Sequence, residues 1–131
     1  MTLDDLVARM CKAQHWTSSQ TGPGWGIEVP QPKGRGQTVF ASVFMDDATA
    51  MVRYLSMIGD ADSIDGNRSK MALELNSKMP HGCLAIHNGH LVVTDTRPLN
   101  TTTPETSAVA VKYLALQADT YERLIYSSDK H

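Results

Sequence analysis

Apolar residues recur at helical spacing in three stretches of the chain. The first stretch predicts a helix that begins after the capping residue Thr2 and fades near His15 or Trp16. The last stretch predicts a helix that Thr103 and Pro104 begin and that reaches about residue 126. The apolar positions of these two helices include Leu3, Leu6, Val7, Met10, Tyr113, Leu114, Leu116, Tyr121, Leu124 and Ile125.

The middle stretch predicts a second helix, which Ser63 or Asp62 can cap and which ends before Pro80. Its spacing is regular enough that we expect Met71 and Leu75 to lie in the core. The face that contains them consists of Ile64, Arg68, Met71, Ala72, Leu75 and Met79.

Alternation of apolar with other residues predicts three strands between the first two helices. A loop from Thr17 to Gly24 precedes the first strand, and a long hairpin connection from Pro30 to Gly36 follows it. The second strand, Thr38 to Met45, is apolar on both faces and is expected near the centre of the sheet, and the third runs from Met51 to Ile58. Their apolar positions are Trp25, Ile27 and Val29, then Val39, Phe40, Ala41, Val43, Phe44 and Met45, then Val52, Tyr54, Leu55 and Ile58.

A hairpin is the strongest local signal in the chain. Asn88 and Gly89 suit the two positive φ angles of a type I′ turn, which pairs His87 with His90. One face of this hairpin is uniformly apolar and is expected to meet the core, whereas the other is mixed. The apolar face carries Leu84, Ile86, Leu91 and Val93.

Length and composition indicate one ordinary globular domain over residues 1–131, with 41% apolar and 20% charged residues. The order of the predicted helices and strands makes its class α+β. Twelve basic and fourteen acidic residues give a formal charge of −2, so no global field favours nucleic acid or a membrane as a partner. No apolar run approaches the roughly 20 residues that span a bilayer, and the start of the chain has no export signal. Two widely separated cysteines, Cys11 and Cys83, form no disulfide framework, so the cytoplasm is the expected location.

Three histidines and a cysteine around the hairpin suggest a zinc site, because imidazole and thiolate are zinc ligands. The turn places His87 and His90 side by side, but Cys83 lies roughly 13 Å from His87 at about 3.3 Å per residue. His81 precedes Cys83 in the sequence and is therefore still farther from His87. We therefore expect exposed histidines at a hairpin tip, with no metal-binding residue.

The other candidate binding and catalytic motifs do not match the patterns that their functions require. The acidic run from Asp60 to Gly66 departs from a calcium loop at its fifth, sixth and twelfth positions, so helix capping explains it better. Neither cysteine lies in an acyl-transfer signature, and Cys11 is expected to be a small buried residue. The residues nearest to a nucleic-acid-binding sheet face are Phe40, Phe44, Arg53 and Tyr54, whose aromatic members are expected in the core.

The order helix–three strands–helix–two strands–helix resembles the class I type III secretion chaperone fold. The stretch from Leu73 to Gly82, with Asn76, Pro80 and Gly82 before the hairpin, is similar to the YbjN-type relatives of those chaperones. This resemblance implies a homodimer that grips segments of other proteins. The chain is less acidic than dedicated secretion chaperones, which favours the broader relatives, and the matching positions carry over no binding residue.

The sequence therefore predicts a non-catalytic, chaperone-like protein-binding module, with no catalytic, cofactor-binding or metal-binding residues. A homodimer is expected because a strand that is apolar on both faces leaves a patch for a second copy to cover. The second helix or the last hairpin would supply that contact. The alternative is a small metal-dependent or hydrolytic enzyme that uses the His87 and His90 hairpin, which stoichiometric zinc in the purified protein would indicate.

Overall fold

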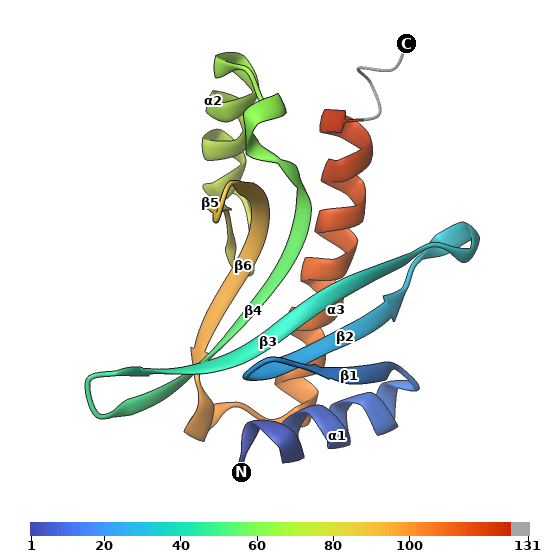
Figure 1. Cartoon of the computed structure of the whole chain (residues 1–131), viewed down its shortest axis with the longest axis vertical. Coiled ribbons are helices and arrows are strands. Elements are labelled where there is room, and N and C mark those ends of the chain that lie inside the picture. The colour runs from blue at the N-terminus through green and yellow to red at the C-terminus, as the bar shows by residue number, and fades with distance from the viewer. Residues whose placement is uncertain (127–131) are drawn as a thin grey trace.

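The computed structural model describes residues 1–126, and it confirms the predicted α+β class (Figure 1). A six-stranded antiparallel sheet has the strand order β1-β2-β3-β4-β6-β5, so β1 and β5 are its edges. Its strands are β1 Thr17–Thr21, β2 Gly24–Pro30, β3 Gly36–Asp46, β4 Thr49–Asp60, β5 Cys83–His87 and β6 His90–Pro98. The helices are α1 Leu3–Gln14, α2 Gly66–Asn76 and α3 Pro104–Tyr121, the 3₁₀ turns are η1 Pro32–Gly34, η2 Ala61–Ser63 and η3 Leu99–Thr101, and a π-helical turn, η4 Glu122–Tyr126, follows α3.

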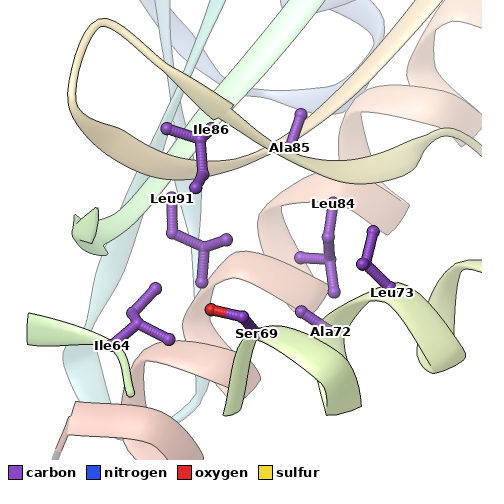
Figure 2. Close-up of a pocket in the computed structure, with 8 residues that line it drawn as sticks. All are labelled: Ile64, Ser69, Ala72, Leu73, Leu84, Ala85, Ile86 and Leu91. Atoms are coloured by element: carbon purple, nitrogen blue, oxygen red, sulfur yellow. The ribbon is translucent and has the colours of Figure 1, made fainter. Parts of the chain in front are cut away.

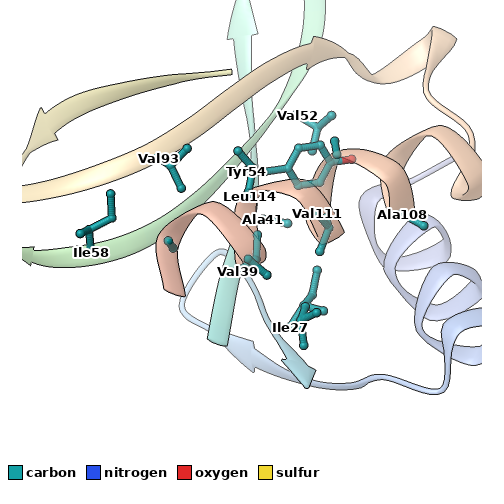
Figure 3. Packing of buried hydrophobic residues seen from close by; sticks show 14 of the residues in the cluster. Ile27, Val39, Ala41, Val52, Tyr54, Ile58, Val93, Ala108, Val111 and Leu114 are labelled. Atoms are coloured by element: carbon teal, nitrogen blue, oxygen red, sulfur yellow. The ribbon is translucent and has the colours of Figure 1, made fainter. Parts of the chain in front are cut away.

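The core lies between the sheet and α1 and α3 (Figure 3). Full burial of each large apolar side chain there contributes about 1.5–3 kcal/mol. The hydroxyl of Tyr54 shares a hydrogen bond with that of Ser107, so this buried phenol has a partner. The buried core includes Leu6, Met10, Ile27, Val39, Val52, Tyr54, Val93, Val111, Leu114 and Ile125.

The prediction of a loop from Thr17 to Gly24 is wrong, because β1 occupies residues 17–21 and pairs with β2. Four strands therefore precede α2, where three were predicted. Every side chain of β1 is exposed, and all are Thr, Ser or Gln. An edge strand whose side chains are all exposed needs no alternation of apolar and polar residues. The sequence of β1 therefore contains no strand pattern, although its backbone pairs with β2.

The second helix is shorter than predicted and buries less. Asp65 caps it and accepts a hydrogen bond from the backbone N–H of Arg68, whereas the predicted caps Asp62 and Ser63 both lie in η2. Leu75 is half-buried, but Met71 is 43% exposed, so the prediction of a buried Met71 is wrong. The reason is position: α2 lies at the β5 edge of the sheet and packs mainly against β5, and among residues 1–126 no further layer covers its outer side.

The remaining elements follow the sequence prediction. Thr2 caps α1, Thr103 caps α3, and Asn88 and Gly89 have φ of 50° and 80° in the predicted hairpin register. Three residues of the apolar hairpin face are buried, but Ile86 is 66% exposed. None of the helices described within residues 1–126 is long and apolar enough to cross a membrane.

Candidate functional site

An open apolar groove of about 240 Å³ separates α2 from the β5–β6 hairpin (Figure 2). Two large apolar side chains at this groove face solvent, since Leu73 is 71% and Ile86 is 66% exposed. A single exposed leucine is unremarkable, but two large exposed apolar side chains beside one groove make it a candidate interaction surface. The groove is lined by Ile64, Ser69, Ala72, Leu73, Leu84, Ala85, Ile86 and Leu91.

Asn76, the last residue of α2, fixes the width of the groove. Its side-chain amide donates to the carbonyl of Leu84 at 3.1 Å, and its Oδ1 accepts from the N–H of Leu84 at 2.6 Å. Both backbone groups of Leu84 therefore point away from β6, toward the free edge of β5. Since these directions alternate along a strand, the backbone groups of Ile86 point to the same edge.

The loop between α2 and β5 requires a glycine at Gly82. Its φ is +65°, and a Cβ built there would lie 2.3 Å from the carbonyl oxygen of Thr94. Only a residue without a side chain lets the chain turn this close to β6. The asparagine and the glycine of the chaperone-like stretch thus both act on the backbone beside the groove.

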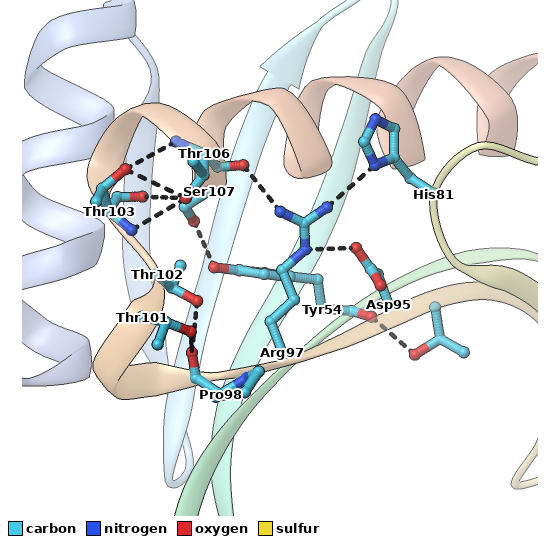
Figure 4. Close-up of polar contacts among 11 residues, drawn as sticks. Tyr54, His81, Asp95, Arg97, Pro98, Thr101, Thr102, Thr103, Thr106 and Ser107 are labelled. Atoms are coloured by element: carbon cyan, nitrogen blue, oxygen red, sulfur yellow. Dashed lines mark hydrogen bonds and ion pairs between the residues drawn. The ribbon is translucent and has the colours of Figure 1, made fainter.

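Arg97 on β6 ties this loop to the rest of the molecule (Figure 4). Its Nε donates to Asp95 at 2.9 Å, its Nη1 to the carbonyl of Thr106 at 3.5 Å, and its Nη2 reaches Nδ1 of His81 at 3.0 Å. Because a guanidinium can only donate, Nδ1 of His81 accepts and carries no proton. The imidazole also packs edge-on against Tyr113 of α3, whose pKa is raised mainly by burial.

The four residues weighed as a zinc site are not brought together. His87 and His90 lie at the hairpin tip and contact Asn88, whereas His81 lies beyond the other end of β5 and is engaged by Arg97. Cys83 begins β5 and is exposed. Over residues 1–126, no three His, Cys, Asp or Glu side chains are grouped closely enough to hold a metal ion.

The acidic run from Asp60 to Gly66 and the thiol of Cys11 have structural roles. Asp60 caps η2 and Asp65 caps α2, as expected for helix-capping acids. Cys11 is buried in α1, and that burial raises the pKa of its thiol.

The aromatic residues expected in the core divide between the two faces of the sheet. Tyr54 is fully buried, but Phe40 and Phe44 are half-buried on the opposite face, where the guanidinium of Arg53 lies 4.2 Å from the centre of the Phe44 ring. Sequence reasoning also missed the groove, because it placed Ile86 in the core and gave Leu73 no role.

No protein-family profile and no curated protein matches this sequence. Among solved structures, the chain is similar to the Yersinia pestis type III secretion chaperone SycH, whose crystal structure is a complex with a stable fragment of YscM2. The two chains are 15% identical with a TM-score of 0.61, over 92% of this chain and 99% of SycH. At this identity the likeness shows the fold, and it confirms the predicted resemblance to the type III secretion chaperone fold.

Proposed function

We propose that this chain is a non-catalytic, chaperone-like module that works as a homodimer and binds a segment of another protein. The observation that carries the proposal is the groove between α2 and β5, with Leu73 and Ile86 exposed around it. Exposed apolar surface of this kind gains about 25 cal/mol for each Å² removed from water. A second protein surface is what removes it.

A second copy of the chain suits the groove because a two-fold axis lets one patch cover its own counterpart. Exposed side chains of α2, Met71 among them, would extend the contact along the helix. The backbone N–H and C=O groups of Ile86 point to the outer edge of β5, where a second strand could pair with them. Those of Leu84 already form hydrogen bonds with the side chain of Asn76. The interface would therefore rest mainly on side chains and not on a long continuous sheet.

A segment of another protein is supported as the ligand by the fold. SycH has a similar fold and is seen in complex with a fragment of YscM2. The YbjN-type resemblance of the stretch from Leu73 to Gly82 points to the same class of binding protein.

Sedimentation equilibrium at micromolar concentrations tests the dimer. The wild-type chain should have twice the monomer mass, and Leu73→Asp should shift it to the monomer by placing a carboxylate in the interface. Val109→Asp is the matched control, because Val109 is also an exposed helical residue, 55% accessible, but lies on α3. A monomeric wild type would refute the dimer, and equal loss of mass in both variants would refute this interface.

A further inference from the structure

A second hollow, of about 460 Å³, lies on the face of the sheet opposite α1 and α3. Its floor comes from β3 and β4 and its wall from the tip of the β5–β6 hairpin. It is lined by Phe40, Ser42, Arg53, Leu55, Met57, His87, Asn88 and His90.

Beside the hollow, the sheet opens between β3 and β4. Pairing of these strands ends at Phe40 and Leu55, while β4 continues beside β6 as far as Asp60. Figure 1 shows the two strands diverging beyond this point. The side chain of Gln37 bridges the gap, donating to the carbonyl of Met57 at 2.9 Å and to the hydroxyl of Ser56 at 3.1 Å.

The floor of the hollow is apolar and accessible. Phe40 and Leu55 are half-buried, and Met57 is 42% exposed. Methionine and aromatic side chains adapt to varied apolar partners, so this floor suits a large apolar side chain of a ligand.

The rim of the hollow carries one permanent positive charge. It holds the guanidinium of Arg53 and the imidazoles of His87 and His90, and no carboxylate, although the chain as a whole has a formal charge of −2. Arg53 rests on the Phe44 ring, and within residues 1–126 no carboxylate forms an ion pair with it. Asp60 lies opposite His90 in the register of β4 with β6, and its carboxylate accepts from the N–H of Asp62. Asp95 pairs with Tyr54, next to Arg53, and forms an ion pair with Arg97.

We propose that this hollow docks a partner segment in which acidic residues flank a large apolar one. The apolar side chain rests on Phe40, Leu55 and Met57, and a carboxylate meets Arg53, whose planar fork suits two parallel hydrogen bonds. This inference rests on the proposed protein-binding function and specifies the chemistry of the bound segment.

Fluorescence anisotropy with two labelled synthetic peptides tests the proposal on the full chain. Both peptides carry the same leucine and phenylalanine residues, which aspartates flank in one and lysines in the other. The aspartate peptide should bind about tenfold or more tightly, because like charges facing each other are costly. Raising the salt concentration should narrow the difference, since exposed charges are screened.

Arg53→Glu should reverse this preference in favour of the lysine peptide. Arg9→Glu, an exposed charge reversal on α1, should leave it unchanged. Met57→Ala should weaken both peptides, because it removes apolar surface from the floor of the hollow. An equal affinity of the two peptides, no binding of either, or an unchanged preference in Arg53→Glu would each overturn the proposal.

An Arg53-dependent affinity for a single-stranded oligonucleotide in place of either peptide would also overturn it, in favour of nucleic acid. Sedimentation of the same variants separates the two proposals. A dimer that binds both peptides equally would contradict only the acidic character of the bound segment and would leave the proposed function standing.

Discussion

The guanidinium of Arg35 forms two parallel hydrogen bonds with the carboxylate of Asp119, 84 residues farther along the chain. Its Nε lies 3.1 Å from Oδ1 and its Nη2 lies 3.0 Å from Oδ2. Asp119 is buried on α3, and Arg35 ends the η1 connection between β2 and β3. The pair therefore fastens the connection between two strands to the last helix.

This pair should make stability depend on pH in the acid range. The hydrogen bonds from Arg35 lower the pKa of Asp119, so the stabilisation is complete above the unfolded pKa of about 3.9. It is lost as the pH falls through the lower folded pKa. Below about pH 5, the free energy of unfolding should therefore decrease less steeply with falling pH in Asp119→Asn than in the wild type. Urea unfolding at several pH values measures this, and Asp62→Asn, at an exposed position, should retain the wild-type slope.

Asn76→Ala should reduce stability by about 1–3 kcal/mol, because the N–H and C=O of Leu84 lose their partner in a partly buried position. Asn67→Ala is the control, since Asn67 is exposed in the first turn of the same helix. The urea midpoint of each variant gives the comparison. Equal midpoints for the two variants would show that the clamp contributes nothing.

Gly82→Ala should destabilise the protein more than Gly89→Ala. Both glycines have positive φ, which costs other residues about 1–2 kcal/mol. A Cβ at Gly82 would also collide with the carbonyl of Thr94, whereas nothing lies within 4 Å of a Cβ at Gly89. Thermal melting of both variants tests the order, and a larger loss in Gly89→Ala would contradict it.

The sequence was informative where a residue's environment is set locally. The caps Thr2 and Thr103, the Asn88 and Gly89 turn and the hairpin register all depend on neighbouring residues, and they follow the prediction. Exposure at the edge of the sheet was not predictable. Met71 and Ile86 have core-like spacing, but within the part of the chain that the structure describes no layer covers them.

The same reasoning explains what was missed at the two hollows. β1 pairs through its backbone alone, so its polar side chains gave no strand pattern. The opening between β3 and β4 arises where one strand leaves its neighbour, a property of two distant segments that no single stretch encodes. The role of Asn76 required knowledge of which strand its side chain would reach.

Gly59→Ala should destabilise the protein by about 1–3 kcal/mol through overpacking. A Cβ there would lie 2.4–2.8 Å from atoms of the Tyr126 ring, whose hydroxyl donates to the carbonyl of Asp60 at 2.7 Å. The loss should be smaller in a Tyr126→Ala background, where the ring is gone. A double-mutant cycle measures this coupling. Additive losses would show that the ring moves aside freely.

His81 should occur as the tautomer with its proton on Nε2, because Nδ1 accepts from Arg97. Long-range nitrogen–proton NMR correlations of the imidazole distinguish the two tautomers directly. Arg97→Gln should permit the other form, since its amide can accept as well as donate. A proton found on Nδ1 in the wild type would contradict this arrangement.

Each edge of the sheet carries a feature that disfavours uncontrolled strand addition. Flat, apolar edge strands template fibrils, since their free N–H and C=O groups accept strands from other molecules. Here β1 presents only Thr, Ser and Gln side chains. On β5, the side chain of Asn76 forms the hydrogen bonds with the N–H and C=O of Leu84 that a neighbouring strand would otherwise form. Unlimited strand addition is thereby disfavoured, although large apolar side chains stay exposed beside β5.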